Sequence, residues 1–176
     1  MEGKSKQQAN EKGFTLMEIL VYIGIFTIVM TYIIGFSLEI VRNRIKNEAM
    51  QAVEENARFA LGRMVQELKE ASSVNTGASV FGVHPGVLTL VMPQAWKNPT
   101  VYDVVGGKLR LTYGTNDPVF VTSENLNVKK LKFYNYSVPG YPQNIKIDLT
   151  LEYINPEHSA EYSAETSMTT TVTLRK

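Results

Sequence analysis

A single carboxylate stands near the start of a long apolar stretch, where its charge needs a partner. Residues 12 to 20 read Lys-Gly-Phe-Thr-Leu-Met-Glu-Ile-Leu, and the carboxylate is Glu18. A charged side chain in a membrane span costs about 2.5–3.5 kcal/mol at the bilayer centre and less toward its edge. Hydrolysis of the bond between Gly13 and Phe14 would create an amine four residues before Glu18. The residues therefore suggest cleavage of the chain, followed by pairing of the new amine, in this copy or a neighbouring one, with Glu18.

This segment resembles the class III signal of type IV pilins and pseudopilins, which joins a basic residue, a glycine, an aromatic residue, a glutamate and an apolar run in this order. The resemblance implies that a prepilin peptidase cuts after Gly13 and that the amine of Phe14 is then methylated. It also implies that Glu18 neutralises the N-terminal amine of an adjacent subunit during filament assembly. The alternative is an ordinary single-span anchor with Glu18 at the level of the lipid headgroups.

The uncharged run from Ile19 to Leu38 has the length of a membrane span. Its 20 residues form a helix of about 30 Å at about 1.5 Å per residue, which matches the hydrocarbon core of a bilayer. A secretory signal peptide has a shorter apolar region and a small-residue cleavage site, which residues 36–39 do not supply. We expect residues 1–13 to be a leader and residues 14–41 to be a lasting span, with the N-terminus in the cytoplasm as the family resemblance implies.

A second, amphipathic stretch continues the same helix. No proline interrupts residues 14–73, and apolar residues recur there every three or four positions, which predicts one continuous helix with an amphipathic part over residues 42–73. The apolar positions are Ile45, Ala49, Val53, Ala57, Ala60, Met64, Leu68 and Ala71. The charged residues Glu54, Glu55, Arg58, Arg63, Glu67 and Lys69 are expected mostly elsewhere around the helix. We expect the apolar face to pack on a sheet rather than to form a dedicated partner site.

The rest of the chain predicts an antiparallel sheet over about residues 80–175. Turn-forming residues separate seven candidate strands, and Gly106-Gly107 between two of them indicates a hairpin. Residues 145–153 alternate apolar and polar side chains, so one face of that strand should be wet. The candidate strands are residues 87–92, 101–105, 108–113, 119–122, 128–136, 145–153 and 166–175. The expected fold class is α+β: a long N-terminal helix packed on an antiparallel sheet, in the pilin-like manner.

Size and charge limit the possible functions. The chain has 176 residues and a formal net charge of +1, and the chain without its leader would be close to neutral. This allows one span and one modest extracytoplasmic domain over residues 42–176, and it argues against strong electrostatic capture of nucleic acid. The absence of cysteine excludes a disulfide framework.

The order of parts after the span resembles minor pseudopilins of the J type and related minor pilins. The resemblance is carried by the helix ending in residues 56–71, the Leu-Arg-Leu hairpin at residues 109–111, the strand around residues 128–134 and the final residues 172–175. It implies a place among the minor subunits that start assembly at the filament tip. A subunit that caps the tip usually lacks the glutamate in that family, so Glu18 argues against a capping role.

Residues with catalytic or metal-binding potential are few. His84 and His158 have no second ligand type at metal-site spacing, and no nucleophile elbow, phosphate loop or dinucleotide fingerprint is present. We therefore expect no enzyme, no cofactor and no metal site. Asp103 with Asn116 and Asp117 could offer oxygen ligands to calcium, but the composition is also ordinary turn chemistry, which we favour.

A cluster of basic and aromatic residues raises the possibility of single-stranded DNA binding. It contains Lys129, Lys130 and Lys132, followed by the aromatic residues Phe133, Tyr134 and Tyr136. Alternation places Lys130, Lys132 and Tyr134 on one face and Leu131 with Phe133 on the other, so a solvated sheet face is the simpler interpretation. The role of Trp96, as an exposed contact or a loop plug, stays open.

The sequence favours a minor pilin or pseudopilin subunit of a type II secretion or type IV pilus-like system, anchored in the bacterial cytoplasmic membrane by a single pass before it joins the filament. Its expected partners are prepilin peptidase, other pilin subunits through the N-terminal helix, the inner-membrane assembly platform and membrane lipid. The alternative is a membrane-anchored binding domain, for example for DNA uptake, that does not polymerise.

Overall fold

The computed structural model describes residues 13–155 and 162–175, which fall into two compact units that divide between Arg42 and Asn43. Helix α1, Leu16–Glu70, passes through this division. It is shorter than expected, by two residues at its start and three at its end. It ends because Ala71 still bonds to Glu67 O at 2.9 Å, whereas the N–H of Ser72 turns to Val91 O at 2.8 Å and opens the first strand.

The unit before Asn43 is an apolar helix whose side chains are exposed in every described residue. Three of its hydroxyl groups are satisfied within the helix, since Thr27, Thr31 and Ser37 each donate to the carbonyl four residues earlier at 2.7–2.9 Å. This is how polar groups are accommodated where water is absent. By length and composition α1 can cross a membrane.

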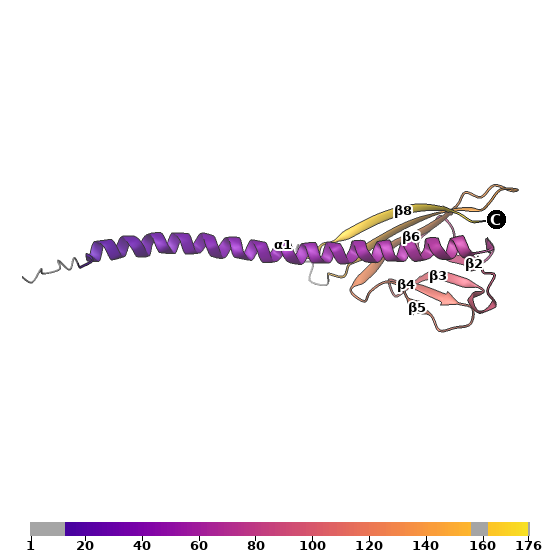
Figure 1. The fold of residues 1–176 in the computed structure, drawn as a ribbon, viewed down its shortest axis with the longest axis horizontal. Helices are drawn as coiled ribbons and strands as arrows, with labels where there is room; N and C mark the ends of the chain where they lie inside the picture. Colours follow the sequence, from indigo (N-terminus) through magenta and orange to yellow (C-terminus); the bar gives the residue numbers. More distant parts are fainter. Residues whose placement is uncertain (1–12, 156–161, 176) are drawn as a thin grey trace, which may run out of the picture. The chain divides into compact units, whose positions relative to one another are not determined.

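Two antiparallel sheets follow α1 in the second unit, where a single sheet was expected (Figure 1). The first has the order β1-β2-β3-β4-β5 and the second the order β6-β7-β8. The first contains β1 Ser73–Val74, β2 Leu88–Val91, β3 Thr100–Val105, β4 Lys108–Tyr113 and β5 Val119–Phe120, with the short 3-10 helix η1 Ala95–Lys97 between β2 and β3. The second contains β6 Leu126–Asn135, β7 Asn144–Tyr153 and β8 Glu165–Thr173.

The strand predictions hold with shifted ends, and β1 was missed because two residues carry no alternation signal. The sheet region therefore begins at Ser73, not at about residue 80. Gly106 and Gly107 join β3 to β4 with φ of 59° and 75°, which is the two-residue hairpin turn that glycine favours. The structure has one long helix and antiparallel sheets, which confirms the predicted α+β fold class. This architecture is consistent with a pilin-like fold.

The core of the second unit lies where α1 meets both sheets. Ala49, Val53, Ala57, Ala60, Met64 and Leu68 are buried, as the spacing predicted, and Leu61 and Glu67 join them. Glu67 is a correction, because it was expected among the solvent-facing charges and is 1% exposed. From β6 and β7 the core receives the alternating residues, among them Leu131, Phe133, Ile147 and Leu149.

Candidate functional site

The predicted processing site lies just before the helix begins. Gly13, Phe14 and Thr15 have no regular secondary structure, and Leu16 is the first helical residue. Thr15 caps the helix: its Oγ1 accepts from the N–H of Glu18 at 3.2 Å, and its carbonyl oxygen accepts from the same N–H at 3.1 Å. Thr15 and Glu18 therefore stand at the first and last positions of a capping-box sequence. The Gly13–Phe14 bond therefore lies outside the helix.

The carboxylate of Glu18 lies in the first turn of α1, where the partial positive charge of the helix N-terminus favours an anion. The hydroxyl of Tyr22, one turn later, donates to Oε1 of Glu18 at 3.4 Å. Both side chains are exposed, so the carboxylate is open to a further partner. The sequence prediction did not include Tyr22, although its i, i+4 spacing from Glu18 is the signal that could have found it.

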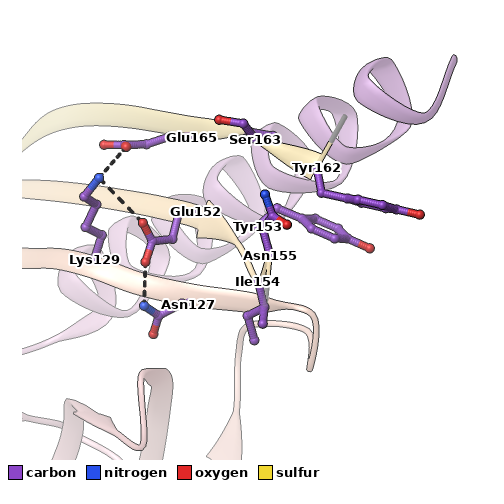
Figure 2. A pocket seen from close by; sticks show the side chains of 10 residues that line it. Asn127, Lys129, Glu152, Tyr153, Ile154, Asn155, Tyr162, Ser163 and Glu165 are labelled. Atoms are coloured by element: carbon purple, nitrogen blue, oxygen red, sulfur yellow. Dashed lines mark hydrogen bonds and ion pairs between the residues drawn. The ribbon is translucent and has the colours of Figure 1, made fainter. Parts of the chain in front are cut away.

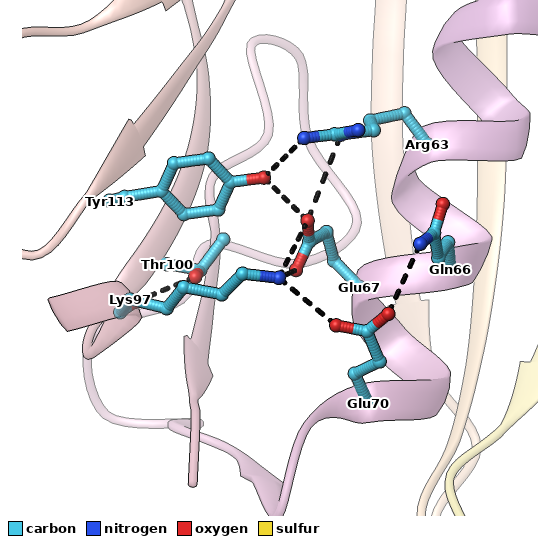
Figure 3. A network of polar contacts seen from close by, with 7 residues as sticks. All are labelled: Arg63, Gln66, Glu67, Glu70, Lys97, Thr100 and Tyr113. Atoms are coloured by element: carbon cyan, nitrogen blue, oxygen red, sulfur yellow. Dashed lines mark hydrogen bonds and ion pairs between the residues drawn. The ribbon is translucent and has the colours of Figure 1, made fainter. Parts of the chain in front are cut away.

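A second polar group of residues is buried between α1 and the first sheet. Figure 3 shows the carboxylate of Glu67 surrounded by Tyr113, Lys97 and Arg63. The hydroxyl of Tyr113 donates to Oε1 of Glu67 at 2.5 Å, and Nζ of Lys97 lies 3.3 Å from Oε2. Nε of Arg63 lies 3.7 Å from Oε1. Lys97 also reaches Glu70 at 3.0 Å, so it joins η1 to two successive turns of α1.

The electrostatics of this network follow from its burial and pairing. Burial alone would lower the pKa of Lys97, but its hydrogen bonds to Glu70 and Glu67 raise that pKa overall. The hydrogen bond from Lys97, with help from Gln66, lowers the pKa of Glu70. Tyr102 is fully buried beside the network, and its hydroxyl has no hydrogen-bond partner. Burial and the negative charge of Glu67 strongly raise the pKa of the Tyr102 hydroxyl. The paired groups, Lys97, Glu67 and Glu70, fix the position of α1 relative to η1.

The basic cluster on β6 is paired with carboxylates of the neighbouring strands. Figure 2 shows Lys129 between Glu165 and Glu152, at 2.6 and 3.6 Å, beside a cavity of about 540 Å³. Asn127 donates to Glu152 at 2.7 Å and holds it in place. A β-bulge lies at this point, since the register shifts between Val128 and Lys130.

Farther along the same face, Asp148 lies 3.9 Å from Lys130 and 3.4 Å from Lys146. Lys132 stands opposite Asp148 in the register of β6 and β7. Leu131 and Phe133 point into the core, as the alternation predicted. This face is therefore a mixed-charge solvated surface, without the excess positive charge that favours nucleic-acid binding.

The residues considered for metal binding have other partners. Asp103 accepts two hydrogen bonds from Arg110 across the β3–β4 hairpin, at 2.8 and 2.5 Å. The N–H of Asn116 bonds to Tyr113 O at 2.9 Å, as in an ordinary turn. Nδ1 of His84 accepts from the N–H of Leu131 at 3.0 Å, whereas His158 lies outside the described residues. Among residues 13–155 and 162–175, no group of three or more potential ligands comes together.

Trp96 lies in η1 with 61% of its surface exposed, and it packs edge-on against Tyr113 at 5.8 Å between ring centroids. It is therefore an exposed side chain that covers one side of the polar network rather than a buried plug.

Among the comparisons with known proteins, a family model matches the N-terminal segment. Residues 8–34 match the family model of the prokaryotic N-terminal methylation motif. No curated protein and no solved structure matches the chain. The matched range contains Gly13, Phe14 and Glu18 and most of the apolar helical part before Asn43, and it leaves the second unit unmatched. The chain thus carries the signal of a prepilin-type precursor, of the kind that type IV pilins and pseudopilins share.

Proposed function

We infer that this chain is a minor pilin or pseudopilin subunit that is cut between Gly13 and Phe14, methylated at the Phe14 amine, and assembled into a type II secretion pseudopilus or a type IV pilus-like filament. The observation that carries this proposal is the methylation motif at residues 8–34, which ends within an exposed apolar helix able to span a bilayer. Such a helix needs a cover, first lipid and then the helices of other subunits.

The geometry at Glu18 supports an assembly role. Among the described residues, the hydroxyl of Tyr22 and the helix N-terminus are the groups that face the carboxylate before assembly. Neither carries a full positive charge, so a cationic amine from a neighbouring subunit improves on both in an apolar setting. The processed Phe14 amine supplies that cation. The role proposed for the second unit is structural, in the initiating tip complex, and catalysis is not part of it.

Replacement of Glu18 tests this proposal. In Glu18→Val and Glu18→Gln proteins, cleavage after Gly13 and membrane insertion should persist, while recovery in sheared filament fractions should fall sharply because the attraction for the amine is lost. Glu39→Gln is the matched control, because it removes a carboxylate just beyond the other end of the uncharged run. Wild-type recovery of Glu18→Val would contradict the assembly role. Loss of cleavage would instead make Glu18 part of peptidase recognition.

A further inference from the structure

Strand β8 is the one long sheet edge, among the described residues, that nothing covers. In the second sheet, β8 pairs with β7 alone. The other edge, on β6, is bonded to loops: Gly82 and Gly86 donate to Phe133 O and Leu131 O at 2.8 and 2.9 Å, and His84 accepts from Leu131. The edges of the first sheet, β1 and β5, have two residues each. Natural sheets usually blunt long edges in such ways.

The alternation of hydrogen bonds between β7 and β8 shows which main-chain N–H and C=O groups of β8 face outward. Ala164 O accepts from Tyr153 N, and Leu174 N donates to Gln143 O, both at 2.8 Å, and the register between these points is continuous. Since bonding alternates along an antiparallel ladder, the even-numbered residues of β8 bond to β7. The odd-numbered residues turn their N–H and C=O groups to the free side: Glu165, Ser167, Thr169, Thr171 and Thr173.

The composition of β8 leaves this edge unprotected. Residues 166–173 have no charge and no proline, and threonine, which favours strands, occupies five of the eight positions. A charge-free strand with a free edge pairs readily with another chain. The edge is therefore either a site of unspecific aggregation or a binding site for a specific partner strand.

A groove beside the edge favours a specific partner. A cavity of about 760 Å³ lies between α1 and the end of β8; Gly62, Val65 and Leu174 line it together with the charged residues Lys69, Glu70 and Arg175. A Cβ at Gly62 would meet no atom within 4 Å, so the backbone there leaves open space. A strand added to β8 would direct alternate side chains over this groove. Glu70 is already paired with Lys97 at 3.0 Å, whereas Lys69 and Arg175 form no ion pair within the described residues, so these two cations would attract a carboxylate.

Antiparallel pairing of two β8 strands does not suit two copies of the chain that leave the same membrane. β8 and the part of α1 beside it run in the same direction (Figure 1). Antiparallel pairing of two β8 strands would make the two α1 segments run in opposite directions. A copy in the same orientation would bring its β6 to this β8, and that edge of β6 is already bonded.

We propose that the outer edge of β8 and the groove beside it bind an extended segment of a different subunit, which adds a strand antiparallel to β8, places small or apolar side chains over Gly62 and Val65, and offers a carboxylate to Lys69 and Arg175. That the partner is another prepilin-type subunit rests on the proposed function. Main-chain bonds supply affinity in this mode of recognition, and the groove supplies specificity.

Site-specific photo-cross-linking in cells that produce the full chain and its filament system tests this proposal. The probe, a benzophenone amino acid, replaces Thr171, whose exposed side chain stands at the free edge. The expected product joins the chain to another prepilin-type protein through an extended segment, as mass spectrometry of the linked peptide would show. The same probe at Lys132, on β6 of the same sheet, is the control and should give no such product.

Two variants make the test specific. Thr169→Pro removes an outward N–H and no main-chain bond to β7, but it also removes the hydrogen bond from Thr169 Oγ1 to Asp148 at 2.8 Å, so Thr169→Val, which loses only that side-chain bond, is its control. Gly62→Leu places a side chain in the groove at a position where an added Cβ meets no atom within 4 Å. Thr169→Pro and Gly62→Leu should each lower the cross-link by about tenfold, the equivalent of one or two hydrogen bonds, with an unchanged thermal unfolding midpoint. If Thr169→Pro unfolds the protein, Gly62→Leu carries the test.

Three results would overturn the proposal: a cross-link between two copies of the chain, a partner without a prepilin signal, or no variant-sensitive product. Processing at Gly13 and the Glu18 phenotype are read independently of β8, so failure of the proposed function is distinguishable from failure at this edge.

Discussion

The hydroxyl of Tyr113 lies 2.5 Å from Oε1 of Glu67, and this contact joins β4 to α1 across 46 positions of sequence. Lys97 reaches the same carboxylate from η1. A buried carboxylate with partners from two other elements holds the helix in one position relative to the sheet. The cost of removing it should therefore be that of breaking a buried pair.

Glu67→Ala should lower the free energy of unfolding of the second unit by about 3 kcal/mol, the low end for a broken buried pair, because Lys97 keeps Glu70 as a partner and Tyr113 keeps Arg63. Denaturant unfolding followed by the fluorescence of Trp96, the single tryptophan, measures this at the network itself. Glu55→Ala is the matched control, since Glu55 is an exposed glutamate on the same helix. Equal effects of the two substitutions would show that Glu67 contributes nothing through its partners.

Two tyrosines near Glu67 should respond differently to loss of the hydroxyl. Tyr113→Phe removes a donor to Glu67 and an acceptor from Arg63, and should cost about 1–2 kcal/mol. Tyr102→Phe removes a buried hydroxyl without a partner, and should be neutral or stabilising. Thermal and denaturant unfolding of the two variants provide the comparison. A larger loss for Tyr102→Phe would mean that its hydroxyl has a partner in solution.

The loss of folding stability at acidic pH should depend on Glu70. Its pKa is below the ordinary 4.5 in the folded protein, chiefly through the hydrogen bond from Lys97. The unfolded state therefore binds this proton more tightly, so the stabilisation is complete above that ordinary value and is lost as the pH falls through the lowered pKa. Unfolding measured from about pH 6 to about pH 3 should give a shallower decline for Glu70→Gln than for the wild type. Parallel curves would exclude this contribution.

The two glycines of the β3–β4 turn distinguish two effects of a Gly→Ala substitution, backbone strain and a clash of the added methyl group. Gly106 and Gly107 both have positive φ, so alanine at either position should cost about 1 kcal/mol. A Cβ at Gly107 would also clash with Oδ1 of Asn127, whereas at Gly106 it meets no atom within 4 Å. Gly107→Ala should therefore be the more destabilising substitution in thermal unfolding. The opposite order would show that Asn127 moves away at no cost.

Local patterns predicted much of this structure. The glycine pair of the hairpin and the alternation along β7 each lie within a few residues, so the sequence shows them directly. The cap that Thr15 forms on Glu18 is equally local, but it was not predicted. The burial of Glu67 was not predictable in this way, because its partners stand 30 and 46 positions away. The division into two sheets depends in the same way on distant pairing. The processing residues Gly13 and Phe14 and the role of Glu18 remain predictions.

The mass of the N-terminal peptide tests the central claim most directly. The chain would be isolated from the membrane or filament fraction of cells that contain a prepilin peptidase, and its first peptide would be sequenced by mass spectrometry. The account predicts a chain that begins at Phe14 and carries one methyl group on its amine. A chain that retains Met1, or one that is cut elsewhere than between Gly13 and Phe14, would contradict it.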